Sequence, residues 1–255
     1  MGWIEKPLVS VIMPAYNAER YIEKSIRSVQ RQTWPDWELI VLDDCSSDRT
    51  AEVAAGLARE DDRIRLYTNE QNLGVARTRN RGLELCRGDY VAFLDSDDAW
   101  RPEKLELQLK CARETGADLV YTSYAIVDAG GEKKCRDFLV PADVSFEGLL
   151  RENVIGCSTV MLSLPVLEGK GFREDFFHED YVLWLQLLNA GRKAAGVEKV
   201  LVDYFFHEDS KAGNKGRAAR KRWNIYRRYL GFSVPKSAWY FGHYALAALR
   251  KYARL

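Results

Sequence analysis

The first half of the chain alternates short, nearly continuous apolar runs with stretches in which apolar residues recur every three or four positions. The continuous runs are typical of strands buried on both faces, and the wider spacing is typical of amphipathic helices. This alternation predicts an α/β domain whose parallel sheet is covered by helices. The expected strands lie within residues 8–17, 37–48, 63–69 and 89–95.

Helices are expected between these strands and after the last of them. Residues 19–30 have helical spacing, with Glu19 in the first turn, where the helix dipole favours an acid. Ser47 or Asp48 is a suitable cap for the helix that follows the second strand. The other two expected helices lie within residues 72–85 and 103–114, the latter begun by Pro102 and ended by Gly116.

The second half is patterned less regularly and predicts a mixed sheet. Residues 119–140 predict two strands joined near Gly130 and Gly131. Further strands are expected within residues 158–163 and 197–207, and a helix that Gly191 ends within residues 179–191. We therefore divide the α/β domain, residues 1–209, into halves of about 1–115 and about 116–209.

The last part of the chain, residues 210–255, has a different charge. It contains twelve Lys or Arg and no Asp or Glu, whereas the whole chain has 38 basic and 37 acidic residues, so residues 1–209 carry a net charge of about −11. The tail predicts two amphipathic helices, 217–230 and 237–252, separated by Pro235. Basic helices with aromatic residues are typical of membrane-surface contacts. The alternative is a helical pair packed on the domain or on another subunit.

Composition excludes several classes of protein. We expect no signal peptide, because no basic region precedes an apolar run, and no transmembrane helix, because no apolar segment reaches about 18 residues. This predicts a cytoplasmic protein, with peripheral contact at the inner face of the membrane if the tail binds lipid. No nucleic-acid motif accompanies the basic tail, so nucleic acid is not an expected partner. The sequence leaves open whether the protein forms a homo-oligomer.

Acidic and polar side chains follow the expected strands where each ends. The segment "VAFLDSDDAW" places three carboxylates directly after a buried strand. Because ligands of parallel sheets bind beyond the carboxyl ends of the strands, these side chains are expected to converge on one edge. The residues expected at this edge are Asn17, Asp43, Asp44, Asp95 and Asp97.

Asp95 and Asp97 share one face of an extended backbone. Two neighbouring carboxylates repel each other unless a positive charge lies between them, and Mn²⁺ or Mg²⁺ prefers oxygen ligands. A solvated turn or helix cap is the alternative for such a pair alone. The buried strand that precedes it favours a metal and phosphate site.

Four ordered segments identify a family resemblance. They are "VSVIMPAYNAERYIEKSIRSVQRQTWPDWELIVLDDCSSDRT", "NLGVARTRNRGL", "GDYVAFLDSDDAWRPEKL" and "EDYVLWL". Together they resemble family 2 glycosyltransferases, inverting enzymes that use nucleotide sugars, over about residues 8–190. The resemblance implies a GT-A fold, a Rossmann-like mixed sheet flanked by helices, here with a helical extension. It also implies sugar transfer from a nucleotide, expected to be UDP, to a saccharide hydroxyl in bacterial surface-polysaccharide biosynthesis.

The resemblance implies roles for residues that match the family's motifs. Asp44 matches the acid that reads the uracil edge, Asp95 lies near the ribose and Asp97 matches the metal ligand. Asp98 supports that ligand or faces the acceptor. The full set implied in nucleotide-sugar binding is Pro14, Ala15, Tyr16, Asn17, Glu19, Asp44, Asn72, Gly74, Arg77, Asp95 and Ser96.

Simpler interpretations stay open for several residues near this edge. Asp43 also suits an Asx turn, and Gly74 also suits a tight turn. Arg77 also suits an ion pair with a surface carboxylate. Arg79 and Arg81 are interpreted as a solvated helix face.

Inversion at a sugar requires a base that takes the proton of the acceptor hydroxyl. By resemblance to the family's Glu-Asp motif, Asp180 is the base, and Glu179 orients it or binds acceptor hydroxyls. The alternative is that both acids only favour the N-terminus of a helix. Trp184, one turn later, belongs to the core or forms a wall for the acceptor sugar.

Three further assignments concern histidines and lysines. His178 is interpreted as structural. His207 follows the last expected strand, where many GT-A enzymes place a residue that closes over the diphosphate, and it is a candidate metal ligand. Lys211 or Lys215 is the alternative phosphate contact. The basic tail suits an acceptor carried on a polyprenyl diphosphate at the membrane.

Two other classes of function compete with glycosyl transfer. A nucleotidyltransferase usually needs a first loop rich in Gly and in Lys or Arg, whereas "PAYNAERY" has one Arg. A dehydrogenase is excluded because no G-x-G-x-x-G follows the first strand. A non-catalytic nucleotide-sugar-binding protein would not need the intact acids at 95, 97 and 180.

Overall fold

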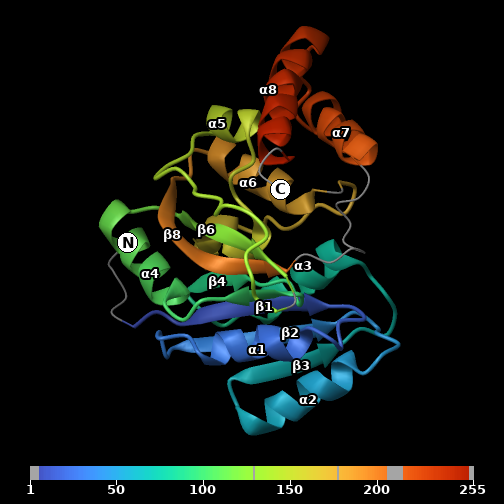
Figure 1. Cartoon of the computed structure of the whole chain (residues 1–255), viewed down its shortest axis with the longest axis vertical. Coiled ribbons are helices and arrows are strands. Elements are labelled where there is room, and N and C mark those ends of the chain that lie inside the picture. The colour runs from blue at the N-terminus through green and yellow to red at the C-terminus, as the bar shows by residue number, and fades with distance from the viewer. Residues whose placement is uncertain (1–5, 129, 177, 206–214, 253–255) are drawn as a thin grey trace.

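One mixed sheet organises the molecule (Figure 1). The computed structural model describes residues 6–128, 130–176, 178–205 and 215–252. Within these ranges the sheet has eight strands in the order β3-β2-β1-β4-β7-β6-β8-β5. The first half contains β1 (Val9–Ala15), α1 (Ile22–Gln30), β2 (Trp37–Asp43), α2 (Thr50–Glu60), β3 (Ile64–Thr68), α3 (Val75–Leu85), β4 (Tyr90–Phe93), β5 (Asp98–Trp100) and α4 (Lys104–Thr115).

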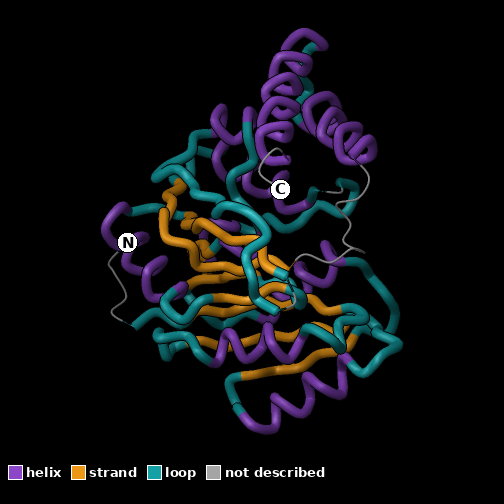
Figure 2. The backbone as a smooth tube through the Cα atoms, in the orientation of Figure 1, coloured by secondary structure: helices purple, strands orange, loops and turns teal. Residues whose placement is uncertain are grey.

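Strands β1 to β4 pair in parallel with one another, as predicted. β1 lies between β2 and β4, and β3 extends the sheet beyond β2 (Figure 2). Alternate residues of β1 face opposite ways, so Val11 and Met13 pack with α1, α2 and α4, while Ile12 packs in a second core with β4 and the second half. Burial on both faces explains the continuous apolar runs.

The second half completes the sheet with mixed pairing. It contains β6 (Leu119–Val127), α5 (Phe146–Arg151), β7 (Met161–Ser163), α6 (Glu179–Asn189) and β8 (Ala194–Phe205). β7 is antiparallel to both β4 and β6, β8 is parallel to β6, and β5 is antiparallel to β8. The prediction of a second strand within residues 119–140 is wrong. After β6 the chain returns to it only through isolated bridges at Lys133 and Phe138, because the charged residues after Gly131 offer no alternating apolar face.

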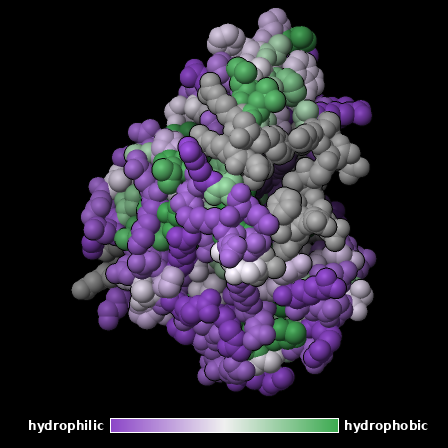
Figure 3. All heavy atoms as spheres, in the orientation of Figure 1, coloured by the Kyte–Doolittle hydropathy of each residue, from purple (hydrophilic) through white to green (hydrophobic). Residues whose placement is uncertain are grey.

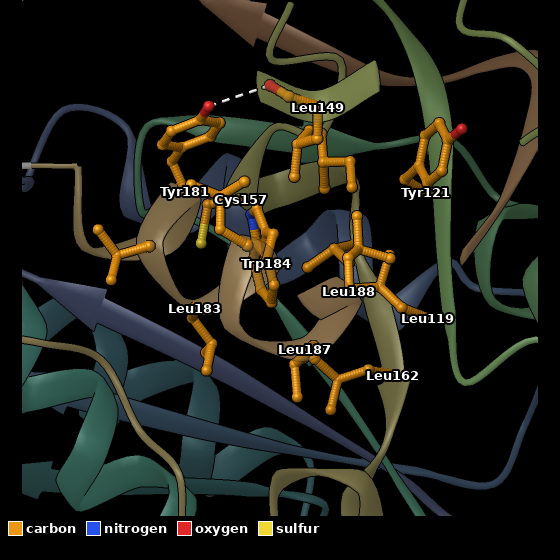
Figure 4. Packing of buried hydrophobic residues seen from close by; sticks show 14 of the residues in the cluster. Leu119, Tyr121, Leu149, Cys157, Leu162, Tyr181, Leu183, Trp184, Leu187 and Leu188 are labelled. Carbon is orange, nitrogen blue, oxygen red and sulfur yellow. Dashed lines mark hydrogen bonds between the residues drawn. The ribbon is translucent and has the colours of Figure 1, made fainter. Parts of the chain in front are cut away.

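Helix α6 is the centre of the second core (Figure 4). Its apolar residues are buried on all sides, and the Tyr181 hydroxyl donates to the Leu149 carbonyl at 3.0 Å. Trp184 is completely buried between Phe93 and Phe172, with ring centroids 6.2 and 6.3 Å away. The core interpretation of Trp184 is therefore confirmed, and it does not form a wall for a sugar.

The tail packs on this second core. It consists of α7 (Lys215–Asn224), a π-helical turn (Ile225–Tyr229) and α8 (Val234–Tyr252). The two helices were correctly expected, but Gly231, at φ +65°, separates them, and Pro235 lies in the first turn of α8, where proline is tolerated. The Tyr226 hydroxyl donates to the Leu150 carbonyl at 2.8 Å, and Tyr240 is buried in the same core.

In Figure 1, α5, α6, α7 and α8 accordingly form the upper part of the molecule. Among the described residues, no helix combines the length and the apolar character that crossing a bilayer requires.

Candidate active site

The carboxyl ends of β1, β2 and β4 meet at one edge of the sheet, as the sequence predicts. The strands are parallel and in register, and the Asp44 amide donates to the Ala15 carbonyl at 2.8 Å. Asn17 therefore lies beside Asp43 and Asp44, with Asp95 and Asp97 directly after β4. This places the predicted polar residues at one edge.

The loop after β1 is held to the loop after β2. Asn17 adopts φ +50°, and its side-chain oxygen accepts from the Ser47 amide at 2.9 Å. A carboxylate oxygen of Glu19 accepts from the Arg49 amide at 3.0 Å, so Glu19 precedes α1 instead of lying in its first turn. Asp48 accepts from the Thr50 amide at 2.9 Å just before α2, but the N-cap residue is Arg49, so the expected cap at Ser47 or Asp48 is wrong.

The remaining members of the first loop differ in exposure. Pro14 and Ala15 are buried in β1, so their side chains face protein instead of solvent. Tyr16 is 53% exposed at the edge, where an aromatic ring is available to a ligand. The loop thus offers a ring and two loop-fixing polar residues.

Asp44 fixes the loop that precedes α3. Its buried carboxylate accepts from the Asn69 side chain at 2.7 Å and from the Leu73 and Gly74 amides, both at 2.8 Å. Gly74 has φ +82° and ψ 158°, a region open essentially to glycine alone. Asn72 is exposed in the same loop. Asp43 accepts from the Ser46 amide at 3.3 Å, which agrees with the Asx-turn interpretation.

Arg79 corrects the expectation of a solvated helix face. Its side chain is 4% exposed, and its guanidinium donates to Asp95 at 2.5 Å and to Glu179 at 2.6 Å. Asp95 follows β4 in the first half, whereas Glu179 begins α6 in the second. Arg79 therefore joins the strand edge to the predicted catalytic acids.

The local packing of α3 explains why Arg79 is buried. Gly82, one turn later on the same face, lies so close to Ile12 that an added Cβ would be 2.6 Å from its side chain. This face of α3 must therefore lie against the sheet. Arg81 is not simply solvated either, since it donates to the Thr68 carbonyl at 3.0 Å and to the Asn69 side chain.

Burial tunes the acids at the start of α6. It raises the pKa of Glu179 and of Asp180 above their ordinary values, while the positive charge of Arg79 opposes the rise in both. Burial also disfavours the charge on Arg79, but the neighbouring acids outweigh this and raise its pKa. Asp180 is thus a carboxylate with increased basicity.

Asp98 and Ser96 fix the acidic segment after β4, residues 95–98, through hydrogen bonds to other elements. Asp98 is 4% exposed, accepts from the Ser158 hydroxyl at 2.5 Å, and has a pKa raised by burial and by the charges of Asp97 and Asp95. This burial favours the supporting role of Asp98 over an acceptor contact. The Ser96 carbonyl accepts from the Ser25 hydroxyl at 2.8 Å, which ties the segment to α1.

The donor set fits a divalent ion that binds together with a diphosphate. Asp95 and Asp97 are both partly exposed, and their charges add to the effect of burial in raising the pKa of the adjacent Asp98. Within the described ranges, no three His, Cys, Asp or Glu residues gather as a complete metal site. One or two carboxylates completed by phosphate oxygens is the usual arrangement for Mg²⁺. His207 and Lys211 lie outside the described residues.

Contacts and burial bear on two further residues, Arg77 and His178. Arg77 forms an exposed ion pair with Glu174 at 2.5 Å, the alternative that the sequence left open. The pKa of His178 is lowered to about 4 by burial and by the charges of Arg222 and Lys221, so its ring is neutral near pH 7. This supports a structural role for His178.

Known structures share this fold. The structure of S. aureus TarS residues 1–349 with UDP-GlcNAc matches with a TM-score of 0.70 at 21% identity, covering 86% of this chain and 64% of that one. A mannosyltransferase, PcManGT from Pyrobaculum calidifontis, in complex with GDP-Man and Mn²⁺, matches with a TM-score of 0.68 at 19% identity, covering 97% and 76%. The fold is therefore the GT-A fold of glycosyltransferases.

Sequence comparison then gives the family. Residues 10–146 match the family model for glycosyl transferase family 2. TuaG of Bacillus subtilis, a glycosyltransferase named for teichuronic acid biosynthesis, is 37% identical over 96% of this chain and 98% of its own length. The Escherichia coli UDP-Glc:alpha-D-GlcNAc-diphosphoundecaprenol beta-1,3-glucosyltransferase WfgD is 35% identical over 96% and 95%. The chain belongs to glycosyl transferase family 2 and is a glycosyltransferase.

Proposed function

We propose that this enzyme transfers a sugar, with inversion, from a UDP-sugar to a saccharide hydroxyl on a polyprenyl diphosphate. The observation that carries the proposal is the Arg79 bridge, which places the acidic strand edge next to the acids of α6. Relatives named for undecaprenyl-diphosphate acceptors support the acceptor class. Surface-polysaccharide biosynthesis follows as the setting.

The sugar donor binds at the strand edge in this proposal. Tyr16, Asn17 and Asn72 line the nucleotide side, and Asp44 fixes the loop beneath it. Asp95 and Ser96 lie at the ribose and Arg77 reaches the diphosphate after leaving Glu174. A bound Mn²⁺ or Mg²⁺, with Asp97 as its protein ligand, supplies charge neutralisation to the leaving diphosphate.

In this proposal, Asp180 and Glu179 of the second half act on the acceptor. Asp180 takes the proton of the attacking hydroxyl, a contribution of typically about 10²–10⁴-fold in rate. Its raised pKa brings its basicity closer to neutral pH than that of an ordinary aspartate. Glu179, held by Arg79, orients the acceptor beside it.

The outer face of α8 suits contact with the membrane that carries such an acceptor. Trp239, Leu246 and Leu249 are 64%, 55% and 68% exposed and lie within one side of the helix. Figure 3 shows hydrophobic atoms gathered over the upper part of the molecule, where α8 lies. Aromatic and aliphatic side chains on a basic segment favour an anionic bilayer surface.

A screen of UDP-sugars with Mn²⁺ tests the function. We expect one UDP-sugar to raise the melting temperature and to be slowly hydrolysed, and EDTA or Asp97→Ala to abolish both effects. Asp62→Ala, a change at an exposed acid before β3, is the matched control. If no nucleotide sugar stabilises or is turned over, the proposed function is wrong.

A further inference from the structure

A cavity lies between the segment before α6 and the start of the tail. It has a volume of about 610 Å³. The segment before α6 forms one wall, and α7 with the π-helical turn forms the other. Its lining residues are Arg173, Asp175, Phe176, Lys221, Asn224, Arg228 and Tyr229.

The lining is cationic. Among the described lining residues Asp175 contributes the one negative charge, and both its oxygens accept from Arg173, at 2.8 and 2.6 Å. The Arg173 guanidinium also lies 5.4 Å from the Phe176 ring and 5.8 Å from the Tyr229 ring, which holds it in place. Lys221 and Arg228 are two further cationic side chains, so the described lining residues include three cations and one acid.

One wall of this cavity comes shortly before the start of α6 in the chain. Phe176 precedes Glu179 by three residues in the chain. The charge of Lys221 lowers the pKa of His178, and the charge of its neighbour Arg222 lowers the pKa of Asp180, so α7 lies within electrostatic reach of the base. Arg222 itself is buried over the Tyr181 ring at 3.6 Å, which fixes α7 against α6.

We propose that this cavity binds the diphosphate that joins the acceptor saccharide to its lipid. The inference rests on the proposed function and names the part of the acceptor that the second half recognises. Each phosphoryl group of such a diester is negatively charged at neutral pH, and Lys221 and Arg228 are the complementary groups. Asn224 adds an amide donor, and the ring pair of Phe176 and Tyr229, 5.6 Å apart, offers an apolar wall to the first lipid carbons.

The geometry favours a diphosphate over a lipid surface at this place. A bilayer contacts convex faces, whereas these cations line a concavity. The exposed apolar side chains that suit a bilayer belong to α8 instead. In this proposal the saccharide held by its diphosphate reaches Asp180, so the contact that binds the carrier also positions the reacting hydroxyl.

Binding of farnesyl diphosphate in EDTA tests this inference. EDTA removes the divalent ions that would let a diphosphate bind at Asp97. We expect the wild type to bind farnesyl diphosphate more tightly than farnesol, and Lys221→Gln/Arg228→Gln to weaken this binding at least tenfold. The matched control is Arg220→Gln, a change at an exposed arginine of α7 that does not line the cavity, and it should bind as the wild type does. Asp97→Ala should also bind normally.

Three outcomes would overturn the inference. The first is wild-type binding that is no tighter for farnesyl diphosphate than for farnesol. The second is a double variant that binds as well as the wild type. The third is a double variant that loses only binding to vesicles of phosphatidylglycerol and phosphatidylcholine, which would make these cations a membrane contact. None of these outcomes depends on UDP-sugar turnover, so failure of the proposed function is recognised separately by the Mn²⁺ screen.

Discussion

The two halves of the site are built in opposite ways. At the strand edge, polar residues are satisfied by one another: Asp44 accepts three hydrogen bonds, and Asn17 and Glu19 each accept from the backbone of the neighbouring loop. At the start of α6, Glu179 and Asp180 head a helix whose other residues are almost all buried and apolar. One half is fixed by hydrogen bonds, and the other is tuned by burial.

This difference suits two different tasks. A loop network that is already satisfied holds its shape before a nucleotide arrives, so binding costs little ordering. Buried acids gain basicity because desolvation disfavours their charge, which a base requires and a binding loop does not. Arg79 touches both halves and is the residue on which their difference can be tested.

The largest expected effect is on catalysis in the second half. Asp180→Asn should lower kcat by about 10²–10⁴-fold, because the amide cannot accept the hydroxyl proton. The affinity for UDP with Mn²⁺, measured by calorimetry, should stay within twofold of the wild type. Equal losses of affinity and turnover would show that Asp180 belongs to sugar-donor binding instead.

Removing the bridge should cost stability. Arg79→Gln leaves two acids without their cation in a largely desolvated place, and we expect a loss of about 3–5 kcal/mol in the free energy of unfolding. Urea denaturation measures it. Arg49→Gln breaks an exposed pair, 70% and 68% solvent-accessible, and should cost far less stability than Arg79→Gln. Comparable losses in both variants would contradict the buried bridge.

A smaller effect is expected in the loop that Asp44 fixes. Gly74→Ala should cost about 1–3 kcal/mol and raise the KM for the sugar donor, because alanine does not tolerate the glycine backbone at this position. Gly56→Ala, in the middle of α2 with no close neighbour, should instead stabilise by about 0.5–1 kcal/mol. The idea of a preformed loop fails if Gly74→Ala leaves the KM unchanged.

The smallest effect on stability is expected at Arg77. Its ion pair with Glu174 is exposed, so Arg77→Gln should change the free energy of unfolding by less than about 1 kcal/mol. If Arg77 reaches the diphosphate during turnover, the KM for the sugar donor rises while stability stays the same. An unchanged KM would leave Arg77 as a surface residue only.

The contrast between Arg77 and Arg79 also shows what sequence can predict here. The strands, most helices and the strand-edge acids follow from periodicity, because backbone geometry fixes which residues alternate and where strands end. The polar helix "VARTRNRGL" gave no apolar stripe, so its buried face was not recognised. The available signal was Gly82, which shares a face with Arg79 and must lie close to another element.

Two other features of the structure, the break in the tail and the cavity beside α7, could not be predicted because tertiary packing decides them. Nothing local marks Gly231 over Pro235 as the break in the tail, since either residue ends a helix and tertiary packing decides. The cavity beside α7 joins Arg173 to Lys221 and Arg228, which follow it by 48 and 55 positions in the chain, and no spacing rule brings such residues together.

The pH dependence of kcat in the wild type and in Arg79→Gln tests most directly whether the two halves share one site. Asp180 must be deprotonated to act, so activity falls as pH decreases through its pKa, which burial raises above the ordinary value. The charge of Arg79 lowers that pKa, so its removal should move the acid limb of the profile to higher pH, and Arg79→Lys should largely restore it. An acid limb that stays in place or moves to lower pH in Arg79→Gln would contradict the account.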